Sequence, residues 1–78
     1  MEKQDFIDFI DYYMSVDFKF LQSLHDNYKG LTPSEIFFLI LFHEGYDDAA
    51  TKNILAVSNT ALRVRKSRIN KKKLNKDA

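Results

Sequence analysis

The stretch SNTALRVRKSRINKKK, residues 58–73, has the spacing of an amphipathic helix with one apolar side and one cationic side. Leu62 and Ile69 lie two helical turns apart, so they share a side that can pack against a core. Ser58 can cap the first turn, because its hydroxyl can accept a hydrogen bond from a backbone N–H that lacks a partner within the helix. The opposite side carries Arg63, Lys66, Ser67 and Asn70. The alternative interpretation of this stretch is a solvated basic tail.

A second, shorter helix is predicted directly before this one. Asp47 can cap a helix over residues 48–55, and Ala56 and Val57 then lead straight into Ser58. A short helix, a tight turn and a second helix with a cationic outer side form the helix-turn-helix pattern. The second helix would span roughly 24 Å, which is enough to cross the major groove of DNA and reach both phosphate walls.

The strongest local signal lies further upstream, in LTPSE at residues 31–35. Thr32 as N-cap and Glu35 three positions later form a capping box, and Pro33 suits the first helical position. The run IFFLILF that follows has the composition of a buried strand, but these capping residues favour a helix that ends before Gly45. Because this helix is apolar on all sides, we expect it to be the buried centre of the domain.

Two more helices are predicted in front of that segment. One covers residues 5–14, and Ser15 or Asp17 can cap another that runs through about Asn27, with Lys29-Gly30 as its stop. The first has an apolar stripe at helical spacing. Its members are Phe6, Phe9, Ile10 and Tyr13. A chain of 78 residues buries only about 60% of its unfolded surface, so association is a common source of extra stability. We therefore expect this stripe to form a homodimer interface.

The fold class expected from these elements is all-α, a small bundle of about five helices that contains a helix-turn-helix. Residues 1–30 would form an N-terminal helical arm, and residues 31–75 the helix-turn-helix domain. The tail LNKDA, residues 74–78, has no packing signal and is expected to fray.

Charge is distributed unevenly along the chain, although the net charge is only +1. Residues 1–50 carry three lysines and ten carboxylates, a balance of −7. Residues 51–78 carry nine lysines and arginines and one carboxylate, a balance of +8. An acidic front and a basic back fit a module that presents one face to a polyanion.

Composition argues against several other classes of protein. The chain has no cysteine, and His25 and His43 stand apart from other ligand-like residues, so we expect no disulfide, metal site or cofactor. No carboxylate pair, nucleophile–base pair or glycine-rich phosphate loop indicates an enzyme, and no catalytic residue is expected. No apolar run is long enough to span a bilayer, and no signal peptide opens the chain. We expect a soluble protein of the bacterial cytoplasm, associated with the nucleoid.

The residues from 31 to 73 resemble the C-terminal DNA-binding domain of LuxR/NarL-type transcription regulators. That pattern opens with Leu-Thr-x-x-Glu, matched by Leu31, Thr32 and Glu35, and closes with Ile-x-x-Lys, matched by Ile69 and Lys72. Its intermediate positions are matched by Leu39, Leu41, Gly45, Leu55, Val57, Ser58, Leu62, Arg63 and Val64.

This chain departs from the family at Thr51 and Lys52, where an Ile-Ala pair is usual. A small residue there lets the two helices of the motif approach closely. Lys52 must therefore extend outward, or the helix must be rotated.

The resemblance implies that groove-facing contacts come from the middle of the helix over residues 58–73. The expected base contacts are Arg63, Val64 and Ser67, the last standing where the family more often has Lys. An arginine can bind guanine O6 and N7 in a bidentate manner. The expected phosphate contacts are Thr60, Lys66, Lys71 and Lys72. Phosphate contacts fix the register of a protein on DNA without reading its sequence.

The leading hypothesis is a sequence-specific transcription regulator that binds double-stranded DNA as a homodimer. The alternative is a protein-interaction module of the same fold that acts on another regulator, a sensor protein or RNA polymerase, and the departure at Thr51 and Lys52 motivates it. A nonspecific binder of RNA or single strands is less favoured. Residues 51–78 contain no aromatic side chain on which bases can stack.

Overall fold

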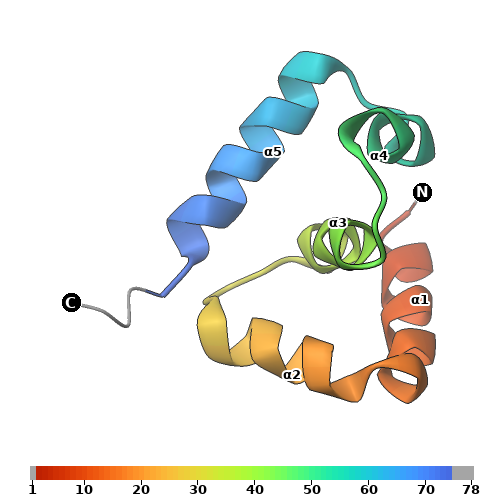
Figure 1. Cartoon of the computed structure of the whole chain (residues 1–78), viewed down its shortest axis with the longest axis vertical. Coiled ribbons are helices and arrows are strands. Elements are labelled where there is room, and N and C mark those ends of the chain that lie inside the picture. Colours follow the sequence, from red (N-terminus) through yellow and green to blue (C-terminus); the bar gives the residue numbers. More distant parts are fainter. Residues whose placement is uncertain (1, 75–78) are drawn as a thin grey trace.

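The computed structural model describes residues 2–74, which form five helices and no strand (Figure 1). The helices are α1 (Lys3–Val16), α2 (Phe18–Asn27), α3 (Pro33–His43), α4 (Asp48–Leu55) and α5 (Asn59–Lys72). This arrangement confirms the predicted all-α bundle of about five helices. Residues 75–78 of the predicted fraying tail, and residue 75 of the predicted second domain, lie outside the described residues. Within the described part of the chain, no helix is long and apolar enough to cross a membrane.

Capping side chains set where these helices begin. Asp17, Thr32, Asp47 and Ser58 each accept a hydrogen bond from the backbone N–H three residues further on, at 2.8–3.3 Å. At α3 the Glu35 carboxylate also accepts a hydrogen bond from the backbone N–H of Thr32 at 2.8 Å, which completes the predicted capping box. Of the two candidates for the start of α2, the structure therefore selects Asp17.

The central helix is α3, which is seen end-on in Figure 1 with the other helices around it. Its apolar side chains point in several directions, and Phe37, Phe38, Ile40 and Leu41 are all buried. Phe38 forms one part of the core together with two buried side chains of α5, Leu62 and Ile69. Helix α3 is apolar on all sides because other helices pack against more than one of its sides.

The other part of the core lies between α1 and α3. The rings of Phe6 and Phe9 lie with their centroids 5.2 and 5.0 Å from that of Phe37. Tyr13 is only 2% exposed, and its hydroxyl donates a hydrogen bond to the Glu44 carboxylate. Burial, together with this hydrogen bond, raises the pKa of Tyr13 above its ordinary range. Three members of the stripe predicted to form a dimer interface thus pack within one chain against α3 or its C-terminal end, and Tyr13 has almost no surface left for a second subunit. The fourth, Ile10, lines a groove together with Leu21 and Leu24 of α2.

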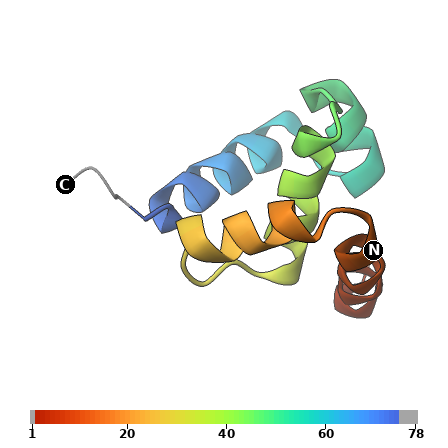
Figure 2. The ribbon, with the colours of Figure 1, turned by 60° about the horizontal axis from the view of Figure 1, so that its bottom comes forward.

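The segment predicted to be a separate arm is also joined to α5 at its far end. The backbone N–H of Lys29 donates to the carbonyl of Lys72 at 2.9 Å, and the N–H of Leu74 donates to the carbonyl of Asn27 at 2.8 Å. The C-terminal ends of α2 and α5 therefore meet, as Figure 2 shows. Residues 2–30 share their packing with the rest of the bundle.

A polar contact fixes the corner between α1 and α2. The Asp17 carboxylate lies 3.0 Å from Nε2 of His43 at the end of α3, and the imidazole stacks on Phe20 with a centroid distance of 3.8 Å. The hydrogen bond with His43, together with that from the Phe20 N–H, lowers the pKa of Asp17. The residue that caps α2 thus also ties α2 to the central helix.

Candidate nucleic-acid interface

A three-residue connection at residues 56–58 joins α4 to α5. Ala56 adopts a left-handed conformation (φ 55°, ψ 46°), and both its N–H and that of Val57 donate to the carbonyl of Lys52. This is a common way to end a helix, although glycine usually occupies the left-handed position. The chain turns sharply there. In Figure 1, α4 is consequently viewed nearly end-on while α5 runs across the view.

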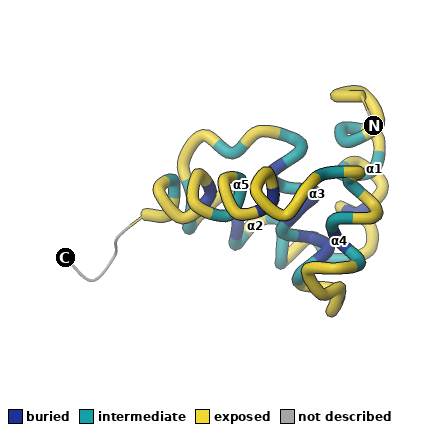
Figure 3. Tube along the Cα trace, turned by 90° about the horizontal axis from the view of Figure 1, so that it is seen from above, coloured by how far each residue is buried: buried dark blue, intermediate teal, exposed yellow. Residues whose placement is uncertain are grey.

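The core contacts of α5 decide which of its sides faces outward. Leu62 and Ile69 are buried against Phe38, so the opposite ridge of the helix faces away from the protein. All members of that ridge are exposed: Thr60, Val64, Ser67 and Lys71. Figure 3 shows that α5 is mainly exposed, with short buried stretches.

The three residues expected to contact bases all lie on the accessible part of this helix. Val64 and Ser67 belong to the outer ridge, and Arg63 is exposed beside it, on the side that faces α4. Among the described residues, no carboxylate forms an ion pair with Arg63. Its guanidinium is therefore accessible to a ligand.

The four residues expected to contact phosphates differ in their surroundings. Thr60 and Lys71 are exposed on the outer ridge. Lys66 instead forms an ion pair with Asp48 at 2.7 Å, and its ammonium lies 5.2 Å from the centroid of the Phe42 ring. This pair is open to solvent, and pairs of that kind contribute at most about 1 kcal/mol, so Asp48 holds Lys66 only weakly.

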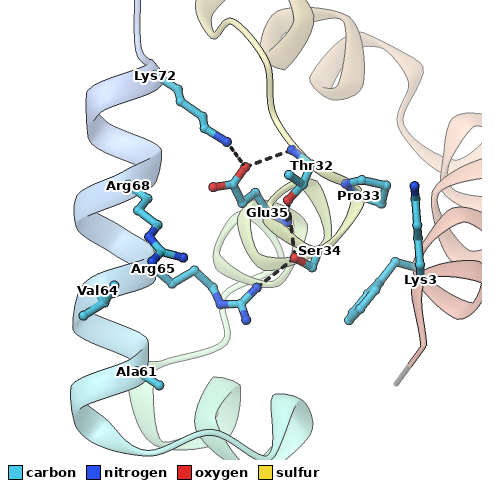
Figure 4. Close-up of a pocket in the computed structure, with 11 residues that line it drawn as sticks. Lys3, Thr32, Pro33, Ser34, Glu35, Ala61, Val64, Arg65, Arg68 and Lys72 are labelled. Atoms are coloured by element: carbon cyan, nitrogen blue, oxygen red, sulfur yellow. Dashed lines mark hydrogen bonds and ion pairs between the residues drawn. The ribbon is translucent and has the colours of Figure 1, made fainter.

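Lys72 has a different role from the one expected of it. Its ammonium lies 2.6 Å from the Glu35 carboxylate (Figure 4). The same ammonium donates a hydrogen bond to the carbonyl of Gly30 at 3.0 Å. Glu35 is buried. Burial opposes its ionisation, but hydrogen bonds from Lys72 and Thr32 outweigh that effect and lower the pKa of the carboxyl. Because its charge is matched by a buried partner, Lys72 ties α5 to α3 rather than facing outward to a phosphate.

Sequence reasoning gave no site role to Arg65 and Arg68. The Arg65 guanidinium donates a hydrogen bond to the Ser34 hydroxyl at 2.9 Å, and Arg68 is exposed one turn further along the same side of α5 (Figure 4). Helical spacing alone places positions 61, 65, 68 and 72 on one side. That this side faces the start of α3 depends on tertiary packing.

The two residues of α4 that depart from the family pattern lie in different surroundings. Thr51 faces inward and is fully buried, and within the described residues its hydroxyl has no hydrogen-bond partner. Lys52 extends along the surface, and its ammonium donates to the side-chain carbonyl of Asn59 at the start of α5. Thr51 thus faces the protein interior, and Lys52 bridges α4 and α5.

No group of three or more potential metal ligands gathers anywhere in the described part of the chain. Comparisons with protein-family models, with curated proteins and with solved structures return no match to this chain. The likeness to LuxR/NarL-type domains therefore rests on the residues quoted above.

Proposed function

We propose that this protein is a sequence-specific regulator that binds double-stranded DNA by inserting α5 into the major groove, with α4, residues 56–58 and α5 as its helix-turn-helix. The observation that carries the proposal is the orientation of α5. Leu62 and Ile69 anchor one side of the helix, while the outer side is exposed and flanked by cations. A helix presented in this way fits the major groove, which is about 12 Å wide.

The side chains on the outer side have the chemistry that such a role needs. Arg63 can form two hydrogen bonds to guanine, Val64 can contact a thymine methyl group, and Ser67 can bond to several bases. Thr60 and Lys71 are exposed at the two ends of the ridge, and their side chains can form hydrogen bonds or ion pairs with phosphates. Recognition of the base sequence and binding of the phosphate backbone are thus assigned to different residues of one helix.

The resemblance to LuxR/NarL-type domains gives independent support. Glu35 comes from the opening of that pattern and Lys72 from its close, and the two form an ion pair at 2.6 Å. Positions at opposite ends of the pattern are therefore in contact in the folded chain. This is the arrangement expected if the pattern defines one domain.

Selection of bound duplexes from a random pool, followed by binding isotherms for two variants, tests the proposal. Arg63→Ala should cost about 1–3 kcal/mol on the selected site and little on a scrambled one. Lys71→Ala should weaken binding to both sites and flatten the salt dependence by about one unit of slope. If Arg63→Ala weakens both sites equally, Arg63 contacts phosphate and the assigned orientation is wrong. If the wild-type protein binds no duplex at any salt concentration, the proposed function fails.

We also propose that two copies act together on an inverted repeat, with half-sites about one helical turn apart. One apolar surface that can serve association is a groove between α1, α3 and α4. Tyr12, 63% exposed, lines this groove together with the exposed side chains of Val16, Tyr46 and Ile54. Exposed apolar surface of this kind commonly marks an interaction site.

The same groove favours the second candidate function, a protein-interaction module that acts on another regulator, a sensor protein or RNA polymerase. Aromatic side chains in a groove that includes Glu44 suit a protein partner. Absence of DNA binding, combined with capture of such a partner that Tyr12→Ser abolishes, would favour this candidate.

A further inference from the structure

A hollow of about 730 Å³ lies between the N-terminal ends of α1 and α3 and one side of α5 (Figure 4). Its polar lining consists mainly of four cationic side chains from two helices, a serine hydroxyl and one carboxylate. These are Lys3, Arg65, Arg68, Lys72, Ser34 and Glu35. The hollow is thus basic and lies beside the outer ridge of α5.

The single carboxylate in this hollow neutralises only one of the four cations. Glu35 is paired with Lys72, and in the described residues no carboxylate comes within 4.0 Å of Lys3, Arg65 or Arg68. Arg65 is held by the neutral Ser34 hydroxyl, which fixes its position without cancelling its charge. Three positive charges therefore surround one concave surface without a counter-charge, which attracts an anion to that surface.

The size and lining of the hollow indicate what kind of anion it suits. Ligand sites commonly have volumes of roughly 300–1,000 Å³, so a phosphate with an attached sugar fits. The planar guanidinium of an arginine matches phosphate oxygens in a bidentate geometry. Phe6, Pro33 and Val64 form an apolar wall that can contact sugar carbons.

We propose that this hollow is a phosphate-binding site, formed by Lys3, Arg65 and Arg68. This assignment rests on the proposed function in one respect, the placement of α5 in the major groove. In that position the hollow lies on the side of α5 opposite Arg63, where the phosphates of one DNA strand would run. Lys3 belongs to α1, so the N-terminal helix becomes part of the DNA-binding surface. The recognised chemistry is a phosphate ester, supplied by the DNA backbone or by a free nucleotide.

The first arm of the test uses duplex DNA and a matched pair of lysines. Lys3 and Lys19 are both exposed and both lie in the N-terminal helices, and each change to alanine removes one positive charge. Lys3→Ala should make the negative slope of log K against log salt shallower by about 0.9 on matched and scrambled duplexes alike. Lys19→Ala should leave that slope unchanged. Arg68→Ala should behave like Lys3→Ala, and an unchanged circular dichroism spectrum verifies the fold of each variant.

The second arm uses adenosine monophosphate and requires no DNA binding. In amide-resolved NMR titrations, the nucleotide should shift the signals of Ser34, Arg65 and Arg68, but not that of Lys19. Lys3→Ala should reduce these shifts. If the nucleotide shifts these signals but the salt slopes on DNA stay unchanged, the site binds a free phosphate ester. If Lys3→Ala and Arg68→Ala change the salt slopes on DNA, the DNA backbone supplies the phosphate.

The proposal is overturned if neither arm responds. In that case Lys3→Ala and Lys19→Ala have equal salt slopes, Arg68→Ala retains the wild-type slope, and the nucleotide shifts no signal around the hollow. This outcome is distinct from failure of the proposed function. A protein that binds a selected site through Arg63 but shows none of these effects keeps the function and loses the phosphate site.

Discussion

Replacing Glu35 by glutamine tests how firmly α5 is tied to the central helix. Glutamine also supports a capping box, so its amide oxygen can still accept the hydrogen bond from the Thr32 N–H. The substitution therefore removes the negative charge opposite Lys72 while leaving the start of α3 intact. Its effect reports on the ion pair alone.

The expected loss follows from the burial of the two partners. The Glu35 side chain is 7% exposed and that of Lys72 is 30% exposed. Breaking a fully buried pair costs about 3–5 kcal/mol, whereas an exposed pair contributes at most about 1 kcal/mol. We expect Glu35→Gln to lower the free energy of unfolding by about 2 kcal/mol. In a domain of this size, such a loss lowers the melting temperature by roughly 8–16 °C.

Urea denaturation followed by circular dichroism measures this loss, and Asp48→Asn is the matched control. Asp48 pairs with Lys66 in a solvent-exposed position, so its substitution should cost well under 1 kcal/mol. If the two variants lose equal stability, the Glu35–Lys72 pair does not tie the helices together as argued. A cost below about 0.5 kcal/mol for Glu35→Gln, within the range of ordinary surface substitutions, would lead to the same conclusion.

The pH dependence supplies a second readout of the same contact. The pKa of Glu35 is lower in the folded state than in the unfolded chain. The stabilisation is therefore fully present above the ordinary glutamate pKa of roughly 4.3 and is lost as pH falls from there through the folded value. The difference in stability between the wild type and Glu35→Gln should accordingly be constant near neutral pH and shrink in acid. A difference that grows as the pH falls would contradict the assignment.

Three further outcomes are expected. Thr32→Ala should cost about 1 kcal/mol in thermal unfolding, because it removes the cap of α3, and an unchanged melting temperature would show that the cap is dispensable. Ala61→Gly, within α5, should lower the free energy of unfolding by about 1 kcal/mol, whereas Ala56→Gly should leave it unchanged because Ala56 already has a left-handed backbone conformation. Equal losses of stability in the two variants would contradict the left-handed conformation at Ala56. Tyr12→Ser should weaken the homodimer in sedimentation equilibrium without lowering the melting temperature, and a wild type that stays monomeric at high concentration would refute the proposed association.

The helices themselves were predictable from sequence because their signals are local. A cap such as Thr32 with Glu35 is recognised within a few residues, and the structure places the start of α3 where these residues predict it. The same is true of Ser58 at the start of α5, since a capping hydroxyl acts on a backbone N–H only three residues away. Such interactions do not depend on the rest of the fold.

The partners of each side chain were less predictable, because they depend on how helices pack. The apolar stripe with Phe9 and Tyr13 has the same pattern whether it covers α3 or a second subunit, and the structure places it on α3. Likewise, Lys72 is one of several lysines near the end of α5, and no local feature indicates that this one reaches Glu35. Cations that face the solvent and cations that hold the fold together look alike in a sequence.

The contacts between α5 and the earlier helices affect the order in which the chain can fold during synthesis. The chain leaves the ribosome N-terminus first, whereas a domain generally folds as a unit. Here the side of α3 that carries Phe38 is covered by Leu62 and Ile69, and the end of α2 is bonded to residues 72–74. A nascent chain that has released only the first three helices would therefore leave the Phe38 side of α3 exposed to water and to chaperones, even with α1 packed on the Phe37 side. The bundle can close only after nearly all of the described chain has emerged.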